Sequence, residues 1–339
     1  MAGAVDPESV QPGPVRQADS GSPAADDRPG LINAIPVRHY GTWVLAVIVI
    51  IGVLMFANMI IFNPVFDWPF VLEVMNQRTV IVGLLIGTLL LTLLTMIVGI
   101  IGGVVLALMR LSSNPILRGV AWVYTWVFRS IPRYVLLVFL GSGMGAIFRD
   151  GIAFGVPFDW KIIELLGLHG SWRFAHVDAN TLFGGFLGAV IGLGASEAAY
   201  MSEIARSGIL SVDQGQHEAA KALGMNSRRA MWRIVLPQAM RVMVPPTGNE
   251  TIAMMKDTSL IIGLGSLTTE LFFQVQNIAT RTFNIVPSYL AAILYYLIVT
   301  SILMIGQSYL ERRFGRGFGS RAPTRGDRAK SGLQAGGAH

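Results

Sequence analysis

Long runs of apolar residues, separated by shorter polar segments, dominate the chain from position 43 to position 310. A helix needs about 20 mostly apolar residues to cross the hydrocarbon core of a membrane, and several runs reach that length. The pattern predicts six membrane-spanning helices, over Trp43–Phe62, Thr79–Met109, a span from about Tyr134 to Phe148, Thr181–Ile204, Val242–Leu267 and Ser288–Leu310. We therefore expect an all-α integral membrane protein.

Two of these runs are interrupted. Val120–Phe148 contains Arg129, Pro132 and Arg133, which predict a helical approach on the cytoplasmic side, a break, and then the span. The fifth run is unusually polar and contains Pro245 and Pro246, so its backbone is predicted to be broken. Irregular backbone at membrane depth is tolerated where it lines a cavity.

Composition supports the membrane class and excludes others. Of the 339 residues, 53% are hydrophobic and 14% are charged, whereas soluble domains carry about 25% charged residues. The chain has no cysteine, so disulfides and thiolate metal sites are excluded. The net charge of +6 lies in segments between apolar runs, which argues against a nucleic-acid partner and for the positive-inside rule.

The distribution of charge predicts the orientation. The Arg110–Arg133 and Arg206–Arg241 segments and the tail after Leu310 are rich in arginine, while the segments facing the other way are mixed. This predicts that both termini of a multi-pass membrane protein lie in the cytoplasm. Residues 1–40 and 315–339 are predicted to be disordered tails, and residues 41–78 an additional N-terminal membrane helix with an external loop.

The external segment 149–180 contains two histidines and two tryptophans. The spacing of His169 and His176, without cysteine or a matched carboxylate, does not favour a metal site. Trp160 and Trp172 instead predict a loop anchored at the membrane surface.

Several predicted spans carry glycines four residues apart, as at Gly99 and Gly103. Glycines at this spacing let membrane helices approach closely. The other such sets are Gly83 and Gly87, Gly141 and Gly145, and Gly184, Gly188 and Gly192.

The segment from Gly215 to Pro237, here called the Gly215–Pro237 segment, is the most informative cytoplasmic stretch. A short helix is predicted over Glu218–Leu223 and ends at Gly224 in the left-handed conformation. A second helix is predicted to begin near Asn226 or Ser227, with Pro237 breaking or kinking it at the membrane. The small residues Ala219 and Ala220 leave a thin surface that suits insertion into a partner's groove.

The fixed positions of this segment carry a family resemblance. Glu-Ala-Ala, then three residues, Gly, nine residues and Ile-x-Leu-Pro resembles the EAA loop of the permease subunits of bacterial ABC importers. The matching residues are Glu218, Ala219, Ala220, Gly224, Ile234, Leu236 and Pro237. Gly215 and Gln216 adjoin the motif, and Leu223 lies within it.

The flanks resemble the polar amino acid uptake subfamily, the relatives of histidine and glutamine permeases. The matching strings are Ala199–Ile209, Pro237–Ala239 and Lys256–Leu260, and Arg129-Ser-Ile-Pro132 stands where the subfamily has Arg-Gly-Thr-Pro. The resemblance spans roughly Thr79–Arg313. Arg133 replaces a usual apolar residue and Glu197 a small one; the first span and the length of segment 149–180 also depart from the family.

The resemblance implies a five-helix permease domain over residues 79–314, with the first span as an addition and the EAA loop as a coupling helix. It implies a separate ATPase subunit that binds ATP and magnesium, a solute-binding protein and a second permease subunit, equal or related. The substrate class implied is a polar amino acid: glutamate, glutamine or a basic one. The chain itself has no Gly-Lys pair, hence no phosphate-binding loop, and no set of catalytic residues. It is therefore not expected to be an enzyme or to hold a cofactor.

Ionisable and polar residues inside membrane spans are costly and usually face a cavity or a partner. We expect five residues to border the substrate path, namely Glu203, Asn249, Lys256, Asp257 and Ser259. Two alternatives stay open: Glu203 pairs with Arg206 at the cytoplasmic end, and Lys256 with Asp257 stabilises helix packing. Glu197 and Glu203 lie about 120° apart on a helix and do not share one face.

Three alternative functions remain. The first is an importer permease for another small solute. The second is an ion-coupled secondary transporter that needs no ATPase, and the third is a membrane anchor or signalling subunit without a transport role. The missing phosphate-binding loop and the Gly215–Pro237 segment favour the ATP-driven importer.

Overall fold

The computed structural model describes residues 40–149, 151–155, 159–167, 173–265 and 269–315. The predicted disordered tails lie outside these ranges except for Tyr40 and Gly315, which belong to helices. The chain divides into two compact units at Met59 and Ile60. The first unit contains most of α1 (Tyr40–Phe62), whose apolar side chains lie on all sides of the helix. An all-round apolar helix of 23 residues suits a lipid environment.

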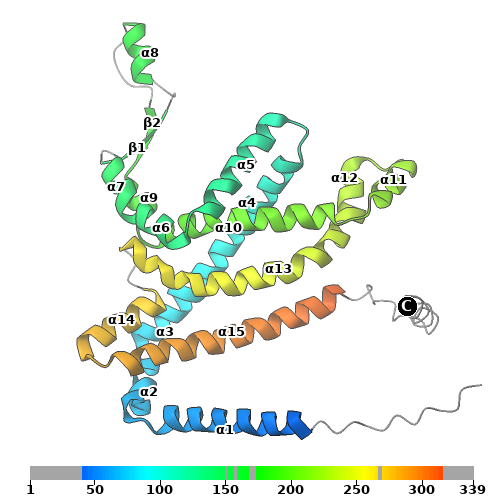
Figure 1. Ribbon diagram of the computed structural model, residues 1–339. Coiled ribbons are helices and arrows are strands. Elements are labelled where there is room, and N and C mark those ends of the chain that lie inside the picture. Colours follow the sequence, from blue (N-terminus) through cyan, green and yellow to red (C-terminus); the bar gives the residue numbers. More distant parts are fainter. Residues whose placement is uncertain (1–39, 150, 156–158, 168–172, 266–268, 316–339) are drawn as a thin grey trace, which may run out of the picture. The chain divides into compact units, whose positions relative to one another are not determined.

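The second unit is a helical assembly (Figure 1). Its first half contains these elements: η1 (Pro64–Phe66), α2 (Trp68–Asn76), α3 (Arg78–Val82), the π-helical turn η2 (Gly83–Leu90), α4 (Leu91–Leu111), α5 (Pro115–Ser130), α6 (Arg133–Val138), the π-helical turn η3 (Phe139–Gly143) and α7 (Met144–Ile147).

A short hairpin and further helices complete the unit. They are β1 (Ile152–Gly155), α8 (Asp159–Leu165), β2 (Arg173–Val177), α9 (Ala179–Phe183), α10 (Gly185–Leu210), α11 (Gln214–Ala222), α12 (Ser227–Ala230), the π-helical turn η4 (Met231–Val235), α13 (Leu236–Asp257), η5 (Thr258–Leu264), α14 (Leu271–Thr282) and α15 (Ile285–Gly315).

Three continuous helical stretches among the described residues are long and apolar enough to span a membrane by themselves: Tyr40–Phe62, Arg78–Leu111 and Ile285–Phe314. The pair α5 and α6–α7 forms a fourth candidate, bent by 100° at the break before Arg133. This bend is where Pro132 predicts one. α10 and α13 coincide with the fourth and fifth predicted spans and are long enough, at about 1.5 Å per residue, but fail the apolarity criterion.

Two buried clusters hold the second unit together. One joins α4, α6, α10, α13 and η5 through residues such as Leu91, Leu137, Leu193 and Met254. The other joins α2, α3, α14 and α15 through residues such as Val71, Val74 and Leu271. Elsewhere many large apolar side chains of α4, α5 and α15 point outward, as expected for a chain whose solvent is lipid. In Figure 1, α13 lies beside α10, and α15 lies beside α13.

Close helix contacts occur where the glycine spacing predicts them. A β carbon at Gly99 would lie 2.5 Å from Cγ of Glu197, and one at Gly103 would overlap Met201. A β carbon at Gly83 would lie 3.1 Å from Cα of Leu271. α4 therefore packs along α10 with almost no side-chain layer between the two backbones.

Three expectations about local structure are wrong. α13 continues through Pro245 and Pro246, and the irregular backbone lies later, in the 3-10 turn Thr258–Leu264. Residues 64–76 form η1 and α2 instead of a loop, because Val71 and Val74 share a buried face and the Asp67 carboxylate accepts a hydrogen bond from the N–H of Phe70.

Segment 149–180 differs as well: it contains an antiparallel hairpin that pairs Ile152 with Val177 and encloses α8, where a surface loop was expected. Trp172, one of the two tryptophans predicted to anchor this segment, lies outside the described residues, and so does His169.

Candidate functional site

The Gly215–Pro237 segment folds as two short helices joined by a tight turn. α11 begins after Asp213, whose carboxylate accepts a hydrogen bond from the N–H of Gly215 at 2.6 Å. It starts four residues before the predicted Glu218 because this cap lies earlier in the chain. Gly224 ends it with a φ of +71°, while the N–H of Met225 donates to the carbonyl of Ala220 at 3.0 Å. This is the left-handed helix end that glycine favours.

The second arm of the segment also follows the predicted capping. The side chain of Asn226 accepts a hydrogen bond from the N–H of Arg229 at 2.8 Å and caps α12. α12 continues through the π-helical turn η4 into α13, which has Pro237 as its second residue. The Gln238 amide donates to the side-chain oxygen of Gln216 at 3.4 Å and connects the two arms.

One face of the segment is anchored and the other is exposed. Val235 and Ala239 form a small buried cluster with Val212, and Ala220 is buried as well. Only Ala219 of the predicted alanine pair therefore lies on the outer surface, together with Gly215, Gln216 and Glu218. Leu223 is 79% exposed and Trp232 is 64% exposed. The outer face of this polar segment therefore displays two large apolar side chains.

A buried charged cluster lies where α6, α10 and α13 meet; we call it the Arg133 cluster. The Arg133 guanidinium lies 2.9 Å from Oε2 of Glu197, 2.5 Å from Oδ2 of Asp257 and 3.8 Å from Oε2 of Glu250. Glu197 is fully buried, and its other oxygen, Oε1, has no hydrogen-bond partner among the described residues. One guanidinium thus faces three carboxyl groups, and one buried acceptor is left over.

A second charged cluster lies toward the end of α10; we call it the Glu203 cluster. Glu203 pairs with Arg110, lies 3.4 Å from Arg129 and 3.0 Å from Arg206. The Tyr200 ring lies between the two clusters, with the guanidinium of Arg133 4.8 Å and that of Arg129 5.5 Å from its centroid. Glu197, Tyr200 and Glu203 of α10 therefore follow Arg133 and Arg129 along one polar track.

The five predicted path residues do not share one site. Asp257 belongs to the Arg133 cluster, whereas Glu203 belongs to the Glu203 cluster, where it pairs with Arg206 as the alternative reading proposed. Asn249 and Lys256 line a separate cavity of about 400 Å³ together with Gln307, whose amide donates to Oδ1 of Asn249 at 2.9 Å.

Ser259 donates its hydroxyl to the carbonyl of Lys256 and is thereby used within its own turn. Arg133, Glu197 and Glu250 are not among the five residues predicted to border the path. Arg133 and Glu197 both replace uncharged residues of the family pattern, and two unusual charges in neighbouring spans predict a pair.

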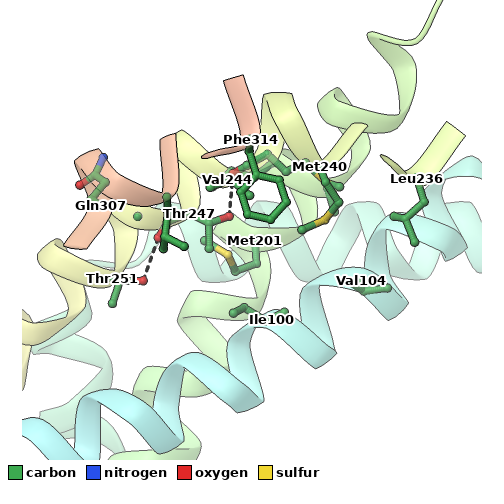
Figure 2. A pocket seen from close by; sticks show the side chains of 15 residues that line it. Ile100, Val104, Met201, Leu236, Met240, Val244, Thr247, Thr251, Gln307 and Phe314 are labelled. Atoms are coloured by element: carbon green, nitrogen blue, oxygen red, sulfur yellow. Dashed lines mark hydrogen bonds between the residues drawn. The ribbon is translucent and has the colours of Figure 1, made fainter. Parts of the chain in front are cut away.

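An apolar cavity lies between α4, α10, α13 and α15 (Figure 2). It measures about 360 Å³ and is lined by residues such as Ile100, Met201, Met240 and Phe314. Its threonines, Thr247 and Thr251, donate to carbonyls one turn earlier, so their polar atoms are already used. Such a lining does not suit a zwitterionic amino acid.

No group of three or more potential metal ligands occurs within the described ranges. The remaining features define a class: a polytopic α-helical membrane protein with a buried charged cluster between its spans and an exposed helix–turn–helix segment.

Comparison with known proteins gives the family. Residues 99–316 match the model of the binding-protein-dependent transport system inner membrane component, and the chain belongs to this family. It is a polar amino acid permease of the ABC importer type.

Individual relatives agree with this assignment. The chain is 43% identical over 300 residues to the arginine transport system permease protein ArgU of Corynebacterium glutamicum, covering 88% of each chain. It is 32% identical over 250 residues to the arginine transport system permease protein ArtQ of Bacillus subtilis, covering 72% of this chain and 92% of the relative. A solved amino acid ABC transporter crystallised with histidines aligns with a TM-score of 0.52 and 30% identity, over 69% of this chain and 94% of that one.

Proposed function

We propose that this chain is the transmembrane subunit of an ATP-driven importer that carries a basic amino acid from a solute-binding protein into the bacterial cytoplasm. The Arg133 cluster is the observation that carries this proposal, because it combines burial with an excess of carboxyl groups. The names of the relatives ArgU and ArtQ, both arginine permeases, support the same substrate class. Glutamate and glutamine, which the sequence leaves open, fit an acidic cluster less well.

The chemistry of the cluster explains this preference. A basic amino acid carries a guanidinium, ammonium or imidazolium group, which donates hydrogen bonds to carboxylates without leaving a charge unpaired. Arg133 already neutralises one carboxylate, which leaves acceptor capacity on Glu250, Asp257 and the second oxygen of Glu197. Because these residues come from α10 and α13, a relative movement of the two helices opens or closes the cluster.

The Gly215–Pro237 segment is proposed to couple this movement to ATP hydrolysis. The exposed Leu223 and Trp232, on either side of the Gly224 turn, offer apolar anchors to a groove on a separate ATPase subunit. ATP and magnesium belong to that partner, since the chain has no phosphate-binding loop. Two permease subunits enclose the path, and the arginine-rich segments of both subunits face the cytoplasm of a cell-membrane complex.

Uptake of radiolabelled amino acids into proteoliposomes tests the proposal. The chain is reconstituted with its partner ATPase and solute-binding protein, and arginine, lysine, histidine, glutamine and glutamate compete for uptake. We expect ATP-dependent uptake of a basic amino acid. Glu250→Gln should lower that uptake about ten-fold or more without changing the affinity of the binding protein, because it removes the negative charge of a half-buried carboxylate in the cluster.

Glu73→Gln is the matched control, since Glu73 is exposed on α2 and lies outside both charged clusters. Uptake driven by an ion gradient without the ATPase would contradict the importer. Equal uptake by Glu250→Gln and by the original chain would contradict the role of the Arg133 cluster.

A further inference from the structure

The Glu203 cluster has more guanidinium groups than carboxylates to pair with them. Three guanidinium groups, from Arg110, Arg129 and Arg206, share the single carboxylate of Glu203. Arg118, one turn before Trp122 on α5, forms no ion pair among the described residues. An arginine presents five N–H donors, so most donors of these four residues remain available to an anion.

The arginines line two neighbouring cavities at the junction of α4, α5 and α10. The larger measures about 480 Å³ and is lined by Arg110, Arg118 and Arg206 together with Leu111, Pro115 and Trp122. The smaller measures about 280 Å³ and contains Arg129, Glu203 and Trp126. Arg110 and Trp122 belong to both linings, so the two cavities adjoin, and we call them together the basic recess.

Exposed aromatic and aliphatic side chains border this recess. Trp122 and Trp126 are both more than half exposed, and their rings stack in parallel with centroids 6.2 Å apart. Ile116, on the first turn of α5, is 73% exposed. Tryptophan favours the level of lipid headgroups, where its ring is half in hydrocarbon and its N–H meets polar groups. Arginine pairs with phosphate through two parallel hydrogen bonds.

We propose that this recess binds the phosphate of an anionic phospholipid, with Arg118 and Arg206 as its principal contacts and Trp122 beside the glycerol and acyl chains. The recess lies at the end of α10 that leads into the Gly215–Pro237 segment, which loop charge assigns to the cytoplasm. Basic pockets between membrane helices on that side are typical sites for anionic headgroups. A bound lipid would link α4, α5 and α10 through a charge that the chain itself does not supply.

Quenching of tryptophan fluorescence by brominated lipids tests this site in the complete transporter in nanodiscs. Brominated phosphatidylglycerol and brominated phosphatidylcholine are each added at increasing mole fraction to an unbrominated phosphatidylcholine bilayer. We expect half-maximal quenching at an at least five-fold lower mole fraction for phosphatidylglycerol. Replacing Trp122 and Trp126 by Phe should remove most of the difference, because these are the tryptophans that line the recess.

Two variants and one competitor make the test specific. Arg118→Gln removes a guanidinium without breaking an ion pair, and about a five-fold loss of the phosphatidylglycerol preference is expected. Arg312→Gln removes an exposed charge from the last turn of α15 and should leave the preference unchanged. Inorganic phosphate should not displace the lipid.

Displacement by millimolar phosphate would overturn the lipid assignment in favour of a free anion. Equal quenching by the two lipids, or an unchanged preference in both Arg118→Gln and Arg118→Glu, would overturn the site. The same loss in Arg312→Gln would reduce the effect to general surface charge and overturn it as well.

Discussion

Arg133 and Glu197 form the most informative pair of residues in the chain. Glu197 is fully buried at 2.9 Å from the guanidinium, in a helix that packs directly on Gly99 of α4. A buried carboxylate is tolerated only with a partner, because an isolated charge in a medium of low dielectric constant costs several kcal/mol. Each departure from the family pattern therefore makes the other one possible.

The pair predicts a compensating effect on stability. Arg133→Met leaves Glu197 without its counter-charge and should cost about 3–5 kcal/mol, which lowers the thermal unfolding midpoint by about 5–15 °C. Adding Glu197→Met removes the buried charge and should recover most of the loss. Circular dichroism of the purified permease in detergent measures both midpoints. A double variant no more stable than Arg133→Met alone would show that Glu197 is not the group that Arg133 neutralises.

At the scale of elements, the interface between α4 and α10 sets the geometry of both charged clusters. Glycines at positions 99 and 103 allow the backbone of α4 to approach α10 within the radius of a side chain. This approach holds Glu197 and Glu203 at fixed depths beside α5 and α6. The interface is therefore the scaffold on which the polar track is built.

A pair of glycine-to-alanine changes tests this interface. Gly103→Ala places a methyl group in the volume of Met201 and should destabilise the protein by about 1–3 kcal/mol through overpacking. Gly306→Ala is the matched control, because a β carbon there meets no atom within 4 Å and gains helix propensity. Thermal unfolding midpoints should fall for the first variant only. Equal midpoints would mean that α4 and α10 are separated more widely than in this fold.

The helices that the sequence predicts well are those with a simple apolar period. Arg78–Leu111 and α15 follow directly from their runs, and the bend before Arg133 follows from Pro132. α13 was predicted to break at Pro245 and Pro246, yet the helix continues and the Gln307 amide lies 3.4 Å from the carbonyl of Pro245. Contacts between helices outweigh the tendency of proline to break a helix there. Such contacts cannot be read from the residues next to the proline.

At the scale of the whole molecule, the type of transporter could be predicted from the sequence more fully than the residues that meet inside the membrane. The Gly215–Pro237 segment is local: its caps at Asp213, Gly224 and Asn226 are set by neighbours within a few residues, so its helices could be predicted. The Arg133 cluster joins residues up to 124 positions apart. The positions of Glu197 and Glu203 on one helix predict that the two side chains are separated. They do not predict which arginine pairs with each of them.

We propose that the two charged clusters, which lie along one helix, serve different steps of transport. The Arg133 cluster has surplus carboxyl groups and fits a cationic substrate, while the Glu203 cluster has surplus guanidinium groups near the segment that leads to the partner ATPase. Movement of α10 affects both at once. The proposed function therefore depends on coupling of ATP hydrolysis to helix movement through the Gly215–Pro237 segment.

Stimulation of ATP hydrolysis by the substrate-loaded binding protein, in proteoliposomes, tests this claim most directly. Gly224→Val forces a β-branched residue to a φ of +71° and should distort the turn that displays Leu223. Gly306→Val, on an exposed face of α15, is the control. We expect Gly224→Val to reduce the stimulated rate of ATP hydrolysis about ten-fold, while the variant still inserts into the membrane and unfolds at the normal temperature. A stimulated rate equal to that of the original chain would contradict it.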